Sequence, residues 1–65
     1  MEINKQLNEI AVSKGIKQIF IAEKTGLTAD TVSKIFMGKR KIMADEFLTI
    51  CAALELDPRN FIKRN

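Results

Sequence analysis

The chain has 65 residues, of which 46% are hydrophobic and 29% charged, and its formal net charge at pH 7 is +3. This length fits one small domain over residues 1–65, with enough apolar content for a helical core, which argues against a disordered chain. One cysteine excludes an internal disulfide, and the lack of histidine leaves no set of zinc ligands. Because no apolar run approaches the about 20 residues of a membrane span, we expect a cytoplasmic protein without metal or cofactor.

A first helix is predicted by apolar residues at helical spacing near the N-terminus, namely Ile3, Leu7, Ile10 and Ala11. We expect this helix to end near Ser13, with Gly15 in the position just past its end, where a left-handed backbone is favoured. Its role is structural, because its apolar stripe would lie across the later helices.

A second helix is predicted over about residues 17–25, and it contains a run of four apolar residues from Ile19 to Ala22. One helical face cannot bury four consecutive side chains, so at least one must be exposed or must pack outside the motif. Phe20 can pack against the first helix or the C-terminal helix. Alternatively, Ile19 and Phe20 form a small exposed patch for a protein partner.

Residues 18–37 predict a helix-turn-helix. Gly26 suits the chain reversal after the second helix, where φ is positive and a Cβ is costly. Thr28 is a ready N-cap for a third helix over 29–36, and Leu27 with Val32 has the spacing of a hydrophobic staple. With its apolar side turned inward, this third helix would leave a polar side outward, free to enter the major groove of DNA.

The residues that we expect to read bases are those on the outward side of the third helix: Thr28, Ala29, Asp30, Ser33 and Lys34. Lys34 pairs best with guanine O6 or N7. Asp30 can only accept hydrogen bonds, which suits the N4 amine of cytosine, but in the first turn it can equally serve to complement the helix dipole.

A basic segment follows directly. Between Asp30 and Asp45 there is no acidic residue, whereas Lys34, Lys39, Arg40 and Lys41 all fall there. Clustered positive charge beside a helix-turn-helix indicates phosphate contacts, although a solvated charged face is the alternative. At the start of the second helix, Lys17 and Gln18 are placed to contact phosphate as well.

The C-terminal third predicts two more helices. Residues 44–56 place Phe47, Ile50, Cys51 and Leu54 on one face, and Cys51 there is a small buried hydrophobe, since no histidine could activate it. Asp57 and Pro58 suit an N-cap and the first position of a short helix over 58–63. Its apolar residues, Phe61 and Ile62, either close the core or leave one side chain for a dimer contact.

From Leu7 to Ile62 the chain resembles the Cro/cI-type (XRE-like) helix-turn-helix family of phage-repressor DNA-binding domains. Three stretches carry the resemblance: Gly15-Ile16-x-Gln18-x-x-Ile21-Ala22-x-x-x-Gly26-Leu27, Thr31-Val32-Ser33-Lys34-Ile35-x-x-Gly38-Lys39-Arg40, and Ala52-Ala53-Leu54-x-Leu56-Asp57. The resemblance implies an all-α, compact five-helix bundle of the lambda-repressor-like type, with the helix-turn-helix formed by helices 2 and 3. It also implies a homodimer, at least on DNA, that binds a pseudo-palindromic operator.

On this resemblance, the early glutamine of helix two corresponds to Gln18, and the phosphate-binding loop after the recognition helix falls on Met37, Gly38, Lys39, Arg40 and Lys41. The chain departs from the family where many members pair a basic residue of helix one with a glutamate of helix three, because those places hold Ala11 and Phe36. An apolar contact should replace that ion pair. Ala29 stands where several relatives carry a base-reading glutamine, so readout from this position should be weak.

The sequence therefore predicts a sequence-specific, double-stranded-DNA-binding transcriptional regulator, a repressor of a bacterium, phage or mobile element. The alternative is a protein-interaction module, such as an antitoxin or anti-repressor, that uses Ile19 and Phe20 or the C-terminal helix. An enzyme is not expected, since the chain has no histidine, no paired acids at site spacing and no Gly-rich phosphate loop.

Overall fold

The computed structural model describes residues 3–61, and every regular element in that range is helical. The elements are α1 (Ile3–Lys14), α2 (Gln18–Thr25), α3 (Ala29–Phe36), α4 (Ala44–Ala53) and η1 (Pro58–Phe61). The all-α class is confirmed. The expected fifth α-helix, however, is a single turn of 3-10 helix, so the described residues form four α-helices and one such turn.

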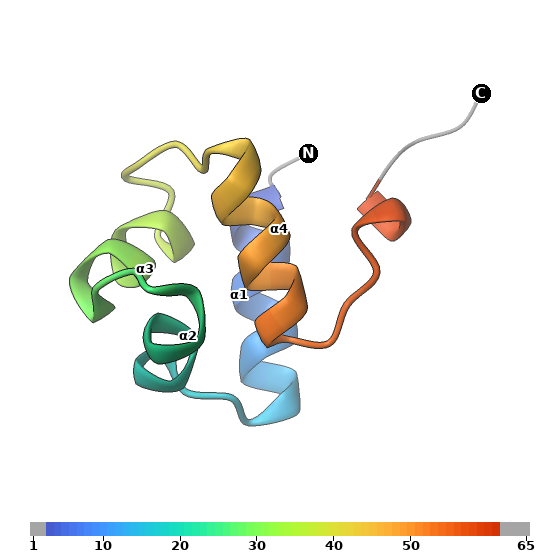
Figure 1. The fold of residues 1–65 in the computed structure, drawn as a ribbon, viewed down its shortest axis with the longest axis horizontal. Helices are drawn as coiled ribbons and strands as arrows, with labels where there is room; N and C mark the ends of the chain where they lie inside the picture. Colours follow the sequence, from blue (N-terminus) through green and yellow to red (C-terminus); the bar gives the residue numbers. More distant parts are fainter. Residues whose placement is uncertain (1–2, 62–65) are drawn as a thin grey trace.

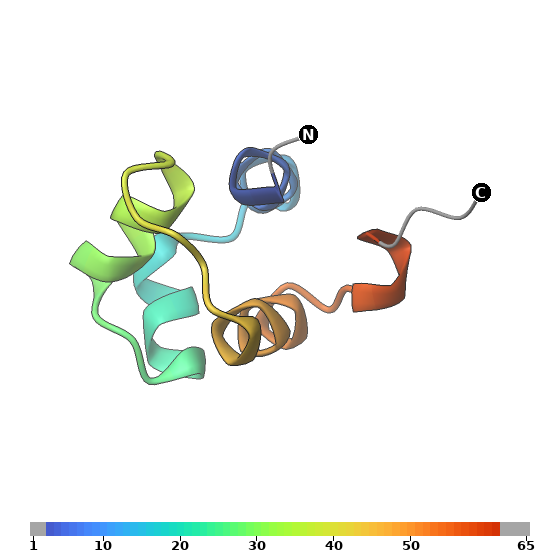
Figure 2. The same cartoon turned by 90° about the horizontal axis from the view of Figure 1, so that it is seen from above.

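The helices surround one core (Figure 1). α2 packs against both α3 and α4, and α1 packs against α3. Seen from above, α1 and α4 are viewed nearly end-on, while α2 and α3 lie together at one end of the molecule and η1 lies at the other (Figure 2). The helix-turn-helix pair thus forms one end of the domain, and α4 packs against α2.

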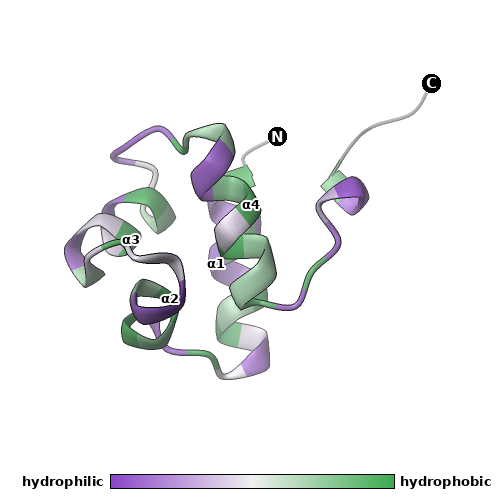
Figure 3. Ribbon diagram, viewed as in Figure 1, coloured by the Kyte–Doolittle hydropathy of each residue, from purple (hydrophilic) through white to green (hydrophobic). Residues whose placement is uncertain are grey.

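The core is entirely apolar within the described range, and each helix contributes to it. Its buried members are Leu7, Ala11, Ile21, Ala22, Val32, Ile35, Phe36, Ile50, Cys51 and Leu54. Hydrophobic and hydrophilic stretches alternate along the ribbon of each labelled helix (Figure 3). Ala11 and Phe36 both belong to this cluster, as expected where relatives place an ion pair. Burial raises the pKa of the Cys51 thiol, with a smaller contribution from Asp57.

The helix ends follow backbone chemistry. Gly26 adopts φ 80° and its N–H donates to the carbonyl of Ala22, which closes α2 as the sequence predicted. The predicted end of α4 at Leu56 is wrong, because the helix stops at Ala53. Glu55 takes the left-handed backbone at φ 58°, and the N–H of Leu56 returns to the carbonyl of Cys51. This reversal carries Leu56 back onto the core.

The last turn is fixed by two contacts. Asp57 Oδ1 accepts from the backbone N–H of Arg59 at 2.9 Å, which confirms the predicted cap. The ring of Phe61 meets that of Phe47 edge-on, with centroids 5.3 Å apart. Ile62 and Lys63, expected in the same helix, lie outside the described residues.

Phe20 is not one of the core residues, and it stays partly exposed beside Ile19. Phe20 as a whole residue is 40% exposed and Ile19 is 57% exposed. The ammonium of Lys24 lies 5.5 Å from the centre of the Phe20 ring. In residues 3–61, every helix is too short or too polar to cross a lipid bilayer.

Candidate nucleic-acid interface

α3 separates its inward and outward sides sharply. Val32, Ile35 and Phe36 are buried, so the helix is held by one apolar face. The predicted base-reading residues lie on the remaining surface: Thr28, Ala29, Asp30 and Lys34 are exposed, and Ser33 is partly exposed. The structure therefore brings all five together along one uncovered edge, as direct readout requires.

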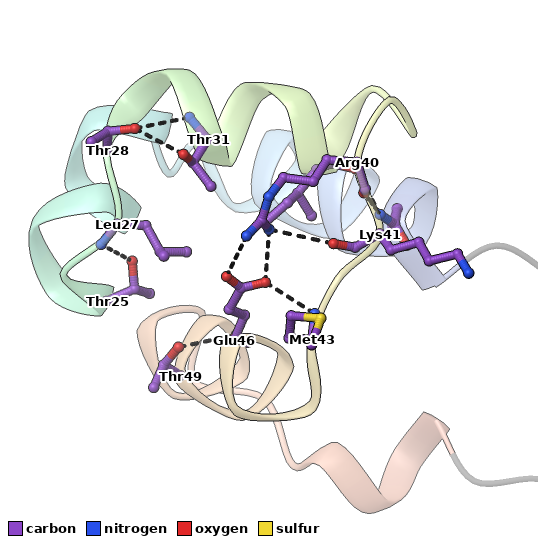
Figure 4. A network of polar contacts seen from close by, with 11 residues as sticks. Thr25, Leu27, Thr28, Thr31, Arg40, Lys41, Met43, Glu46 and Thr49 are labelled. Carbon is purple, nitrogen blue, oxygen red and sulfur yellow. Dashed lines mark hydrogen bonds and ion pairs between the residues drawn. The ribbon is translucent and has the colours of Figure 1, made fainter.

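Thr28 begins this edge and also fixes the helix. Its Oγ1 accepts from the backbone N–H of Thr31 at 3.1 Å and donates to Thr31 Oγ1 at 3.0 Å, which confirms the predicted N-cap (Figure 4). Because the hydroxyl is occupied by these bonds, the Thr28 methyl group is the part best suited to touch a base.

Asp30 and Lys34 interact with each other. The Lys34 ammonium lies 3.2 Å from Asp30 Oδ2, and both side chains are more than half exposed. An exposed pair at this spacing is worth only about 0.5 kcal/mol, so a base or phosphate can compete for Lys34 at little cost.

The loop of residues 37–43 follows α3 with its first amides already used. The N–H groups of Met37, Gly38 and Lys39 donate to the carbonyls of Ser33, Ile35 and Lys34, with Gly38 at φ 76°. These three amides close the helix. Phosphate contacts from this part of the loop must therefore come from side chains, above all from the exposed Lys39.

Arg40 has a partner that the sequence did not suggest. Its guanidinium donates to both carboxylate oxygens of Glu46, at 2.8 and 2.9 Å (Figure 4). The hydrogen bonds from Arg40 lower the pKa of Glu46 to about 2, helped by the N–H of Met43, and the same pair raises the pKa of Arg40. The basic segment contains no acidic residue, but in the folded protein the carboxylate of Glu46 contacts it.

Asn4 was also missed. Its Nδ2 donates to the carbonyl of Ile35 at 2.9 Å and to that of Arg40 at 3.2 Å, so α1 holds both the end of α3 and the loop. No local pattern signals such a contact, since its partners lie 31 and 36 positions away. For Arg40 and Glu46, the only available signal was opposite charge on either side of a short loop.

The start of α2 reaches the protein surface, because Lys17 is exposed. Lys17 is the N-cap residue, with extended backbone and no capping bond from its side chain within the described residues, as its poor cap chemistry predicted. Gln18 opens the helix and is half-buried. The first backbone N–H groups of a helix lack intrahelical acceptors, so this end can receive an anion.

The sequence matches the family described as Helix-turn-helix over residues 7–61. This range covers most of the chain, and the protein belongs to this family, the XRE-like class that the motifs indicated. It is a DNA-binding transcriptional regulator by class, which confirms the function predicted from the sequence in its general form. No curated protein sequence matches the chain.

Solved structures share the fold, among them the following two. One is the restriction-modification controller protein C.AhdI from Aeromonas hydrophila, which is 26% identical with a TM-score of 0.84, covering 94% of this chain and 92% of that one. The other is the clp gene regulator ClgR from C. glutamicum, which is 18% identical with a TM-score of 0.82, covering 88% of this chain and 74% of that one. The second likeness concerns the fold alone.

Proposed function

We propose that the protein is a sequence-specific repressor of transcription that places α3 in the major groove of double-stranded DNA. One observation carries this proposal: the polar edge of α3 is uncovered, while its opposite face is locked into the core. The similarity to a controller protein supports the regulatory role. The protein acts in the cytoplasm, and the proposal assigns it no catalytic activity.

In this proposal the edge of α3 selects the site and the flanking groups supply the affinity. Lys34 reads guanine, Ser33 and Asp30 add hydrogen bonds, and the methyl groups of Thr28 and Ala29 meet thymine. Lys17 and Gln18 contact phosphate on one side, and the loop from Met37 to Lys41 does so on the other through its exposed lysines, Lys39 and Lys41. Met37 and Gly38 contribute there through the shape of the loop, since their amides are occupied.

Two copies are needed for tight binding. One recognition module of this size covers roughly 600–1,000 Å² on DNA, which is small for a specific complex. We therefore expect a homodimer on a pseudo-palindromic operator, with half-sites about 34–36 Å apart, so that each α3 enters the same face of the duplex.

Selection of bound sequences from a random duplex pool tests these points together. We expect one enriched motif with two inverted half-sites. Lys34→Ala should cost about 1–3 kcal/mol on the selected site and relax its sequence preference. Lys39→Ala should weaken all duplexes alike and flatten the salt dependence. Equal affinity of the wild-type protein for every duplex would contradict the proposal.

The exposed pair Ile19 and Phe20 favours a second candidate function, the binding of a protein partner as an antitoxin or anti-repressor would. In that case Ile19→Ser should abolish capture of the partner while the melting temperature stays unchanged. Co-purification with a partner, without any shift of DNA, would favour this function over the first.

A further inference from the structure

The side chain of Arg40 reaches toward α4 and is 39% exposed. Its guanidinium meets the carboxylate of Glu46 through two parallel hydrogen bonds, and the glutamate side chain is only 12% exposed. Figure 4 shows this pair bridging the gap between the loop and the first turn of α4. Such a bidentate contact between a guanidinium and a carboxylate fixes the orientation of the two side chains as well as their distance.

The same carboxylate also holds the end of the loop. Glu46 Oε1 accepts from the backbone N–H of Met43 at 3.0 Å, and Arg40 donates to the carbonyl of Lys41 at 3.3 Å. From the other side, Asn4 Nδ2 donates to the carbonyl of Arg40. The middle of the loop is therefore tied to α4 through the Arg40 side chain and to α1 through its backbone.

The neighbours of Arg40 are left in solvent. Lys39 and Lys41 are both exposed, one on each side of the anchored residue. Arg40 and Glu46 together carry no net charge, so the positive charge that this loop presents comes from the two lysines. Both terminal nitrogens of the Arg40 guanidinium bind Glu46, and one of them also donates to the carbonyl of Lys41. Binding a phosphate through the same edge of the guanidinium would require Arg40 to abandon Glu46, which would leave an unpaired carboxylate beside the DNA backbone at an electrostatic cost.

We propose that Arg40 and Glu46 are positioning residues for DNA binding, which touch no phosphate and instead hold the loop so that Lys39 and Lys41 do. The inference rests on the proposed function, since it assigns roles within the same interface. Its physical basis is preorganisation: a loop fixed before binding does not have to be ordered on the duplex.

A comparison of two neighbouring acids tests the proposal. Glu46→Gln and Asp45→Asn each remove one negative charge from the first turn of α4. Asp45, however, is exposed, and within residues 3–61 its side chain makes no hydrogen bond or ion pair to the loop. Charge alone would make both variants bind DNA at least as tightly as the wild type. We expect Asp45→Asn to do so, whereas Glu46→Gln should bind about three- to tenfold more weakly, the cost of ordering one or two long side chains.

Arg40→Gln gives a second, independent readout through the salt dependence of binding. Each phosphate neutralised by the protein contributes about 0.9 to the slope of log affinity against log salt. If Arg40 only positions the lysines, Arg40→Gln weakens binding but keeps the wild-type slope. The double variant with Glu46→Gln should then be no weaker than either single one, because both remove the same contact.

Circular dichroism and melting temperatures show whether each variant is folded at the temperature of the binding assay. If Glu46→Gln is unfolded there, the salt dependence of Arg40→Gln tests the positioning role on its own. Glu46→Gln binding as tightly as Asp45→Asn, or Arg40→Gln losing about 0.9 from the slope, would overturn the positioning role and leave the regulator proposal intact. A wild-type protein that binds no duplex would overturn both.

Discussion

Asp30 holds Lys34 from one helical turn away, so the most promising base-reading cation of α3 is partnered by an acid on the same exposed edge. This arrangement lets a single substitution separate the two roles considered for Asp30. If Asp30 reads cytosine, Asp30→Asn should weaken binding to the selected operator. If Asp30 only complements the helix dipole and restrains Lys34, every duplex should be bound about twofold more tightly, the worth of an exposed pair at this spacing.

Titration of the operator and of one unrelated duplex against Asp30→Asn distinguishes these outcomes. Asp45→Asn serves as the control for the change in net charge, because Asp45 lies on α4 and not on the recognition helix. Unchanged affinity for both duplexes would mean that Asp30 has no part in DNA binding.

The stability of the fold should depend on pH through Glu46. Hydrogen bonds from Arg40 and Met43 lower the pKa of Glu46 from 4.5 to about 2 in the folded protein. A carboxylate with a lowered folded pKa contributes stability that is fully present above its unfolded pKa and is lost as the pH falls through the folded value. The contribution of this residue should therefore disappear between about pH 4.5 and pH 2.

Melting temperatures recorded across that range measure the effect. The wild type should lose more stability on acidification than Glu46→Gln, so that the two curves converge near pH 2. Arg59 lowers the pKa of Asp57 in the same direction, but both proteins share that contact and it cancels from the difference. Parallel curves would show that the pair with Arg40 does not persist in solution.

The helix-turn-helix was predictable because its determinants are local. Gly26, Thr28 and the apolar spacing of Val32 and Ile35 each act within a few residues, and α3 has the predicted bounds. Its outward residues followed from the same periodicity, because residues that do not face the core must face solvent. The burial of Phe36 followed from the absence of an ionic partner at Ala11.

The contacts that hold the loop could not be predicted in this way. Asn4 binds the carbonyl of Arg40, which lies 36 positions further along the chain. Glu46 reaches Arg40 only because the loop turns back toward α4. The end of α4 was missed for a different reason. The residue in the left-handed position is Glu55, and a sequence without glycine at that point carries no stop signal.

Packing of the last turn should depend on Phe61. Its ring meets Phe47 at 89° with centroids 5.3 Å apart and is half-buried. Phe61→Ala should therefore lower the free energy of unfolding by about 1–2 kcal/mol, less than for a fully buried aromatic residue. Urea denaturation measures the loss. Phe20→Ala is the control, and because Phe20 is 40% exposed and lies outside the core we expect a smaller change. Equal effects of the two substitutions would contradict the packing role.

Glycine at position 55 should stabilise the protein. Glu55 adopts φ 58°, a left-handed backbone that costs a residue with a Cβ about 1 kcal/mol and costs glycine little. Glu55→Gly should therefore raise the free energy of unfolding by up to about 1 kcal/mol, although the added freedom of glycine in the unfolded chain offsets part of this gain. The matched control is Glu23→Gly, the same substitution at an exposed position inside α2, which should instead cost about 1 kcal/mol. Urea denaturation of both variants gives opposite signs if Glu55 ends α4 in this conformation, and two losses of similar size if position 55 is helical in solution.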